Sequence, residues 1–366
     1  MADTPISPAA KPRKKRLGPF LLVAFLAVLL IGWSAFWFIA RGRVHDALTI
    51  WIAQEATQGR NWSCPERTVQ GFPFRFEIRC SDLRFTGSTP AGQAEGHLPL
   101  FLAVAQVYKP NHVIVEATGP LVAELSDGSG RVRFNWQTFD ASIVFSGNRL
   151  DRTSLVMTSP DIRFESLATE TLLLSASELE SHMRIDPDRP VEDHAYDFAL
   201  TVRHASLPPL DRLLGSDDKT DIVIQGAITE AAPFTAASPA VELERWRNAG
   251  GKLDLMLVRL NKGLQRLDGT ASLSLDDLHR PQGRIEASVA GLDELLARFG
   301  FGGGGNRGLG ALISGGLQIL GGNNQRAPGA EQTEQPAGLT KLPPVVLRDG
   351  RIYAGPFNVG QVAPLY

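Results

Sequence analysis

The chain has 366 residues, of which 43% are hydrophobic and 21% charged, a composition that fits a globular protein with one large or two ordinary domains. Its net charge of −2 provides no basic field for a polyanion, so no nucleic-acid partner is expected. The composition also argues against general intrinsic disorder.

Residues 17–40 form an apolar segment, LGPFLLVAFLAVLLIGWSAFWFIA, that contains no charged residue. As a helix it would extend about 36 Å, enough to cross a hydrocarbon core of about 30 Å. Five basic residues within 1–16 precede it and only Arg41 and Arg43 follow closely, which favours a cytoplasmic N-terminus. Its length and bulky end favour an uncleaved anchor over a cleaved signal peptide.

Residues 41–59 continue the helical pattern beyond the apolar segment. Val44, Leu48, Trp51 and Ile52 recur at helical spacing on one stripe, and a glycine at position 59 provides a stop signal. We expect this stripe to pack on the domain that follows, with a helix lying on the membrane surface as the alternative.

A strand is predicted from Phe74 to Cys80, because apolar and charged residues alternate strictly there. Cys64 and Cys80 are the only cysteines, and in an oxidising compartment we expect them to form a disulfide worth about 3 kcal/mol. Two free buried thiols are the alternative. No metal site is indicated, since no histidine lies nearby.

Residues 98–230 read as a long antiparallel meander of short strands separated by Gly, Asp, Asn or Pro. A short helical turn is expected at 207–214, LPPLDRLL. A helix opening on a proline follows at 238–251, SPAVELERWRNAGG, and then three strands and a second short helix at 292–300. No constant repeat period can be fixed from the sequence.

Residues 300–338 are rich in glycine, but the glycines lack the Gly-Lys-Ser/Thr sequence of a phosphate-binding loop and follow a predicted helix. Nucleotide binding is therefore not expected, and no cofactor is predicted. Leucines within 308–322 recur at helical spacing and are expected to pack on the body, with contact to lipid or ligand as the alternative. Asp349-Gly350 is a strong turn signal for a closing hairpin.

The sequence resembles an uncharacterised alphaproteobacterial envelope family known as domain of unknown function 2125. The resemblance rests on GFPFRFEIRCSDLRF at 71–85, DGTASLSLD and PQGRIEASVAGLDELLA within 268–297, and DGRIYAGPFNVGQVAPLY at 349–366. It implies no catalytic residue. The glycine-punctuated strands are also distantly similar to AsmA-like envelope proteins, which are anchored in the inner membrane and implicated in lipid homeostasis.

No catalytic signature is present, and no enzymatic activity is predicted. The seven histidines form neither a His-Glu-x-x-His motif nor another pair with metal-ligand spacing, and no Gly-x-Ser-x-Gly elbow occurs. Paired acids such as Asp217-Asp218 and Asp276-Asp277 fall in apparent turns, where aspartate is favoured by local hydrogen bonds. The predicted catalytic, cofactor and metal site residues are therefore none.

The expected architecture is mainly β, with long antiparallel meanders or curled sheets, a few short helices and one transmembrane helix. The domains are predicted as a cytoplasmic tail (1–16), an anchor (17–40), a periplasmic body (41–299), a flexible segment (300–338) and a C-terminal hairpin that returns to the body (339–366). Two functions are considered for this inner-membrane protein. One is the binding of lipid or another apolar ligand in a sheet-lined groove, and the other is a scaffold that docks envelope proteins through a sheet edge.

Overall fold

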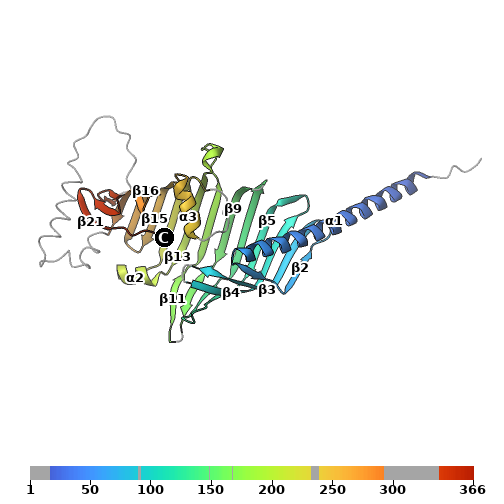
Figure 1. The fold of residues 1–366 in the computed structure, drawn as a ribbon, viewed down its shortest axis with the longest axis horizontal. Helices are drawn as coiled ribbons and strands as arrows, with labels where there is room; N and C mark the ends of the chain where they lie inside the picture. The colour runs from blue at the N-terminus through green and yellow to red at the C-terminus, as the bar shows by residue number, and fades with distance from the viewer. Residues whose placement is uncertain (1–16, 90–91, 148, 167, 232–238, 292–337) are drawn as a thin grey trace, which may run out of the picture.

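A computed structural model describes residues 17–89, 92–147, 149–166, 168–231, 239–291 and 338–366 (Figure 1). Its strands form one large, wholly antiparallel sheet, and an N-terminal helix runs out from one end of that sheet. The prediction of a mainly β fold behind an apolar helix is therefore confirmed. The tail 1–16, the helix expected at 292–300 and residues 300–337 of the predicted flexible segment 300–338 lie outside the described residues.

Helix α1 (Leu17–Thr57) is continuous from the apolar segment through the stretch expected as a second helix. Among the described residues it is the one helix long and apolar enough to cross a membrane, a property that membrane anchors and signal segments share. Helix α2 (Pro208–Leu214) forms at the helical turn predicted for 207–214, and α3 (Pro239–Asn248) forms at the proline-opened helix predicted for 238–251. The 3-10 turn η1 (Val191–Asp193) was not predicted.

The main series of strands follows the chain outward from α1, each strand paired with the next. In spatial order it comprises β2 (Glu66–Gln70), β3 (Arg75–Thr89), β4 (Gly92–Gln106), β5 (Lys109–Thr118), β8 (Thr138–Ser146), β9 (Arg149–Thr158), β12 (Glu178–Ile185), β13 (Tyr196–Ala205), β14 (Thr220–Ile228), β15 (Leu253–Lys262), β16 (Gln265–Leu275) and β17 (Pro281–Ala290). Beyond it lie β18 (Thr340–Lys341), β19 (Val345–Arg348), β20 (Arg351–Ala354) and β21 (Phe357–Gln361). Strands β19 and β20 form the hairpin that the Asp349-Gly350 turn predicted.

A second, shorter series branches from residues 84–86 of β3 and residues 94–97 of β4, which lie beside the turn between these two strands. It comprises β1 (Asn61–Ser63), which pairs with β3, and β6 (Leu121–Leu125), β7 (Arg131–Asn135), β10 (Asp161–Glu165) and β11 (Glu170–Ser175), which continue from β4. Between β5 and β12 the chain crosses from one series to the other four times, at residues 119–120, 136–137, 159–160 and 176–177. The stretch 170–185, expected as a single strand, is therefore divided into β11 and β12.

The crossings reveal an internal repeat of 40 residues. Strand β9 begins 40 residues after β5 (149 − 109), β10 begins 40 after β6 (161 − 121), and β12 begins 40 after β8 (178 − 138). Thr118-Gly119-Pro120 and Thr158-Ser159-Pro160 occupy the same place in the two copies. The repeat lays two equivalent four-strand units side by side, which lengthens the sheet away from α1.

Candidate functional site

One face of the main series is apolar from end to end. Residues that face each other across an antiparallel pair lie on the same side of the sheet, so a chain of cross-strand partners follows one face. One such line crosses twelve strands from β2 to β17 through Val69, Ile78, Ala103, Val115, Ala141, Leu155, Ser181, Leu200, Ile224, Val258, Gly269 and Ala287. It contains no charged residue.

Two parallel lines on the same face have the same character. The first runs from β3 to β20 through Phe76, Ala105, Val113, Ile143, Thr153, Met183, Phe198, Gly226, Leu255, Ala271, Ile285, Val345 and Ala354. The second runs from β8 to β17 through Phe139, Met157, Leu179, Val202, Ile222, Leu260, Leu267 and Val289. We call the residues of these three lines the inner face.

The opposite, outer face carries the charges, and it pairs them across neighbouring strands. Arg184 Nη2 lies 3.3 Å from Asp197 Oδ2 across β12 and β13, and Arg259 Nε lies 3.0 Å from Asp268 Oδ1 across β15 and β16. Asp254 accepts a hydrogen bond from Ser272 Oγ at 2.7 Å. Although burial raises the pKa of Asp254, its bonds to Ser272 and Arg189 bring that pKa below the ordinary value. A charged outer face directed to water leaves the inner face as the side for apolar contacts.

Helix α1 covers the inner face at the start of the sheet. Trp37 is 2% exposed and packs with Val69 and Phe76, its ring stacked 5.8 Å from that of Phe76. Farther along α1, Trp51 contacts Trp62 of β1 at 5.9 Å between ring centres. The stripe predicted on residues 41–59 therefore packs against the body. The apolar segment and the inner face meet at this end of the molecule.

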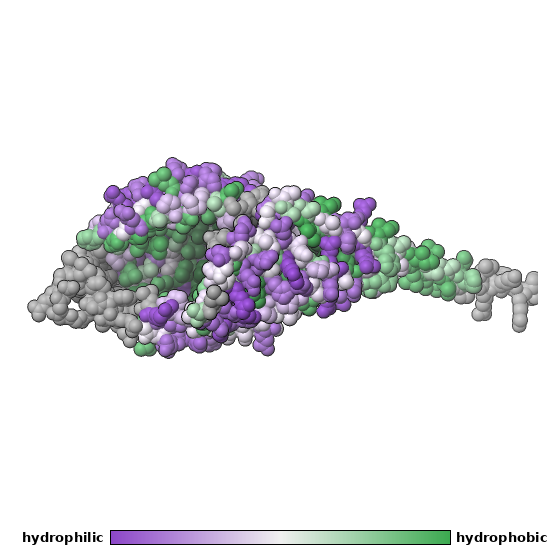
Figure 2. Space-filling view, turned by 60° about the horizontal axis from the view of Figure 1, so that its bottom comes forward, coloured by the Kyte–Doolittle hydropathy of each residue, from purple (hydrophilic) through white to green (hydrophobic). Residues whose placement is uncertain are grey.

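Among the residues that the structure describes, no side chains close the inner face away from α1. Leu200, Ile224, Leu255 and Val258 are only half-buried although they lie mid-strand. Figure 2 shows a hollow with a hydrophobic lining and a hydrophilic rim in the half of the molecule distant from α1. A sheet whose apolar face stays accessible within the described residues is suited to hold an apolar ligand.

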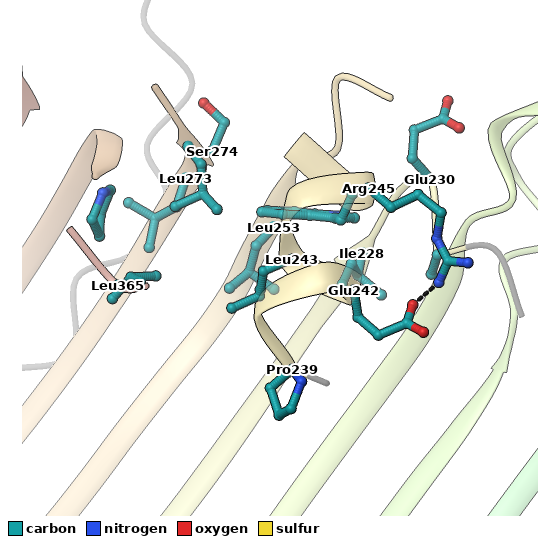
Figure 3. A pocket seen from close by; sticks show the side chains of 14 residues that line it. Ile228, Glu230, Pro239, Glu242, Leu243, Arg245, Leu253, Leu273, Ser274 and Leu365 are labelled. Atoms are coloured by element: carbon teal, nitrogen blue, oxygen red, sulfur yellow. Dashed lines mark ion pairs between the residues drawn. The ribbon is translucent and has the colours of Figure 1, made fainter. Parts of the chain in front are cut away.

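Helix α3 roofs part of the inner face and encloses a pocket of about 700 Å³, which we call the α3 pocket (Figure 3). Ile228, Leu253 and Leu273 of three adjacent strands form its floor, and they continue the inner face because each lies two residues from a member of its lines. Leu243 and Trp246 of α3 face them. Trp246 Nε1 donates a hydrogen bond of 2.8 Å to the carbonyl oxygen of Thr229, which satisfies the polar edge of the ring and fixes α3 over the strands. The pocket lining is thus almost wholly apolar.

Two charged side chains of α3 line the α3 pocket and pair with each other. Glu242 and Arg245, one turn apart on α3, form an ion pair that Figure 3 shows directed away from the leucines. Glu242 is buried, so the arginine offsets the cost of placing a carboxylate beside an apolar wall. The leucine wall of the α3 pocket is thereby kept apart from these charges.

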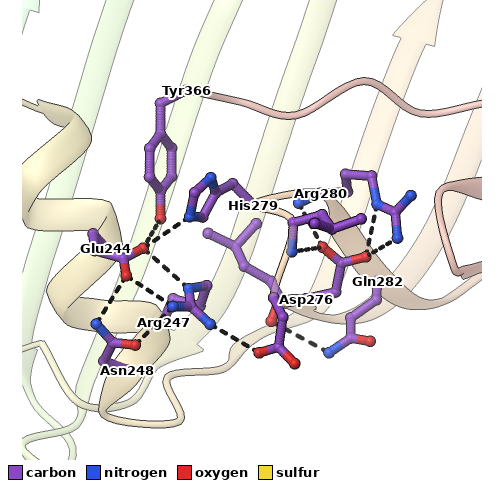
Figure 4. Close-up of polar contacts among 11 residues, drawn as sticks. Glu244, Arg247, Asn248, Asp276, His279, Arg280, Gln282 and Tyr366 are labelled. Carbon is purple, nitrogen blue, oxygen red and sulfur yellow. Dashed lines mark hydrogen bonds and ion pairs between the residues drawn. The ribbon is translucent and has the colours of Figure 1, made fainter.

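A second polar cluster fastens the last residues of the chain to α3 (Figure 4). Tyr366 Oη donates a hydrogen bond of 2.8 Å to Glu244 Oε2, and its ring stacks on His279 with 4.4 Å between ring centres. Leu365, next to it, lines the α3 pocket. Hydrogen bonds from Arg247 and then Tyr366 lower the pKa of Glu244 to about 2, so this carboxylate is ionised at neutral pH.

The predicted disulfide partners lie at the α1 end of the sheet. Cys64 and Cys80 are joined by a disulfide with 5.8 Å between their Cα atoms. Among the described residues no group of three His, Cys, Asp or Glu side chains is arranged to hold a metal ion. The α3 pocket and the Tyr366 cluster were missed from sequence, although the alternation of apolar residues in β13 to β17 was a signal for the pocket floor.

Comparison with known proteins identifies the family. A family model described as an uncharacterised protein conserved in bacteria, domain of unknown function 2125, matches residues 37–363. The chain belongs to this family. The family match begins at Trp37, the residue that packs α1 on the sheet, and runs through the hairpin at the other end. No curated protein matches the sequence significantly.

Proposed function

We propose that this protein is anchored in the bacterial inner membrane by residues 17–40 and binds lipid acyl chains along the inner face of a periplasmic body. The observation that carries the proposal is the uncharged inner face, which continues from the foot of α1 through the α3 pocket to the closing hairpin. Each methylene group that such a surface removes from water contributes about 0.8 kcal/mol. The affinity for a bound acyl chain would therefore increase with the number of its methylene groups, and no catalytic group is needed.

The proposed location rests on two independent features. The basic residues before the apolar segment favour a cytoplasmic N-terminus. The disulfide between Cys64 and Cys80 suits an oxidising compartment beyond the membrane.

A photoactivatable phospholipid with a diazirine in its acyl chain tests the proposal. The full chain, purified in detergent, is irradiated with this probe and the labelled peptides are mapped by mass spectrometry. We expect labels on β13 to β17, in addition to those on α1. Labels confined to α1 would refute acyl-chain binding by the body.

A matched pair of variants locates the binding surface. Ala271→Glu places a charge on the inner face, whereas Thr270→Glu places it one residue away on the outer face. We expect A271E to lose the label on β15 to β17 and T270E to retain it. Because a charge on the inner face could also disturb folding, Leu255→Trp, which fills the same surface without a charge, should lose label while keeping the wild-type melting temperature.

The exposed end of the sheet favours docking of envelope proteins as a second candidate function. Within the described residues β21 pairs with β20 alone, and its Phe357 and Val359 are 59% and 60% exposed. A free strand edge is a template for another strand. A photocrosslinker placed at Val359 should then capture an envelope protein in intact cells, and a control crosslinker at Thr270 should not. Equal capture at both positions, or none at Val359, would reject docking through this edge.

A further inference from the structure

A second pocket, of about 450 Å³, lies between α1 and β2. Its α1 side is formed by Phe38, Arg41 and His45, and its β2 side by residues 67–70. We call it the α1–β2 pocket. Strand β2 pairs with β3 on one side within the described residues, so the pocket occupies the flank of the sheet beside its edge strand.

Two arginines line the α1–β2 pocket, and among the described residues neither has an acidic partner. Arg67 Nη2 lies 3.2 Å from His45 Nε2 and donates a hydrogen bond of 2.9 Å to Thr49 Oγ1, and neither contact is to a carboxylate. Within the described part of the chain, neither Arg41 nor Arg67 forms an ion pair, in contrast to Arg184 and Arg259 of the outer face. Two guanidinium groups without counterions leave the pocket ready for an anion.

The pocket lies where α1 emerges from its apolar segment. Phe36, Phe38 and Ile39 are more than half exposed immediately before Arg41, as expected for side chains that contact lipid. One turn earlier, Trp33 Nε1 donates a hydrogen bond of 2.9 Å to the carbonyl oxygen of Pro73, and aromatic rings of this kind favour the membrane interface.

The β2–β3 turn reaches the same level as the pocket. Phe38 stacks on Phe72 with 5.9 Å between ring centres, and Phe72 and Phe74 of this turn are 50% and 62% exposed. A bilayer whose hydrocarbon boundary follows Trp33 and Phe72 has its phosphate layer beside Arg41 and Arg67.

We propose that the α1–β2 pocket binds the phosphate of an anionic phospholipid from the bilayer around α1. The proposal rests on the membrane anchoring included in the proposed function. Arg41 and Arg67 pair with the phosphate oxygens through charge-assisted hydrogen bonds, His45 orients Arg67, and the rings of Phe38 and Phe72 contact the start of the acyl chains. The site sets the height of the sheet on the bilayer and places an anionic lipid at the α1 end of the inner face.

Native mass spectrometry of the full chain in non-ionic detergent tests this site. Phosphatidylglycerol, phosphatidylcholine and inorganic phosphate are titrated separately. We expect the wild type to retain phosphatidylglycerol in preference to phosphatidylcholine, and the double variant R41Q/R67Q to retain roughly tenfold less, equivalent to about 1.4 kcal/mol. The variant R43Q/R79Q is the matched control, because it removes the same charge from two exposed arginines outside the pocket.

Three results would overturn the proposal. They are wild-type retention by R41Q/R67Q at an unchanged melting temperature, an equal loss in R43Q/R79Q, and equal retention of phosphatidylcholine. Displacement of phosphatidylglycerol by inorganic phosphate at equal concentration would assign the site to free phosphate instead. The variant A271E separates this site from the inner face, since it should lose acyl labelling on β15 to β17 and keep phosphatidylglycerol at the α1–β2 pocket.

Discussion

The ammonium group of Lys262 lies 2.6 Å from Asp211 Oδ1, and the lysine side chain has no exposed surface. Lys262 ends β15, whereas Asp211 lies in α2, and the lysine also donates a hydrogen bond to the carbonyl oxygen of Asp218. Ser206 Oγ donates a hydrogen bond of 3.3 Å to the other carboxylate oxygen of Asp211. This buried pair holds α2 and the loop after it against the ends of β14 and β15.

Lys262→Ala should destabilise the protein by about 3–5 kcal/mol, because it leaves the buried carboxylate of Asp211 without its cation. The double variant Lys262→Met with Asp211→Leu removes both charges and should recover most of that loss. Lys219→Met, at an exposed lysine one residue before buried Thr220, is the control. Chemical denaturation of the full chain in detergent measures the difference. Equal stability of K262A and K219M would show that the pair contributes nothing.

Trp37→Ala should loosen α1 from the sheet and cost about 3–5 kcal/mol of stability, because a 2% exposed ring is replaced by a cavity. Trp37→Phe keeps most of the packing but loses the 3.1 Å hydrogen bond from Trp37 Nε1 to the carbonyl oxygen of Arg75, which should cost about 1 kcal/mol. Ile39→Ala, at a 65% exposed position of the same helix, is the control and should change little. If W37A melts at the I39A temperature, α1 is not held by this contact.

Local patterns were sufficient to predict many elements of the fold. The alternation from Phe74 to Cys80, the proline that opens α3 and the Asp349-Gly350 turn each depend on neighbouring residues, and each predicts its element correctly, although β3 begins one residue later, at Arg75. Periodicity along one strand does not reveal which strands pair, so the length of the continuous inner face could not be predicted.

Contacts between distant parts of the chain account for what was missed. Lys262 and Asp211 are 51 residues apart, and Tyr366 and Glu244 are 122 apart, so neither pair has a local signature. The 40-residue repeat escaped notice because the two copies share few residues beyond Thr118 and Pro120 with Thr158 and Pro160. The sequence shows Arg41 only as a flank of the apolar segment, because Arg67 joins it in one pocket through the packing of β2 on α1.

Stability should fall in acid as Asp268 becomes protonated. The hydrogen bond from Arg266, opposed by burial and reinforced by Arg259, lowers the pKa of Asp268 to about 2. In the unfolded chain the pKa of aspartate is about 3.9. A depressed folded pKa means that the stabilisation is complete above about pH 4 and is lost as the pH falls toward 2.

Asp268→Asn should therefore lower the free energy of unfolding by about 1–2 kcal/mol at neutral pH, a value reduced because solvent screens the partly exposed arginines. The variant should also show a weaker dependence of stability on pH between about pH 4 and 2. Glu192→Gln, at an exposed acid of η1, is the control and should leave the acid slope unchanged. Denaturation midpoints measured from neutral pH to pH 2 give the loss of stability at neutral pH and the slope of stability in acid. A D268N protein with the wild-type slope would show that other carboxylates dominate the acid response.

The contact between Tyr366 and Glu244 should govern access to the α3 pocket. Tyr366→Phe removes the hydroxyl that donates a hydrogen bond to Glu244. The substitution leaves Leu365 in the α3 pocket and an aromatic ring stacked on His279. We expect faster amide hydrogen exchange at residues 362–366 and in α3, together with faster release of an acyl probe. Lowering the pH from about 4 toward 2 should have the same effect, because the folded pKa of Glu244 is about 2 and that of an unfolded glutamate is about 4.3, so the contact weakens progressively as the pH falls between these values.

Tyr353→Phe is the matched control for this prediction. Tyr353 lies on β20, where its ring is contacted by the guanidinium of Arg348 at 5.7 Å. The control variant should keep the wild-type exchange rates in α3 and at residues 362–366, and the wild-type rate of probe release. If Y366F and Y353F exchange alike, the last residues of the chain are held on α3 by packing of Leu365 in the α3 pocket, and the pH dependence of probe release should then be absent in the wild type as well.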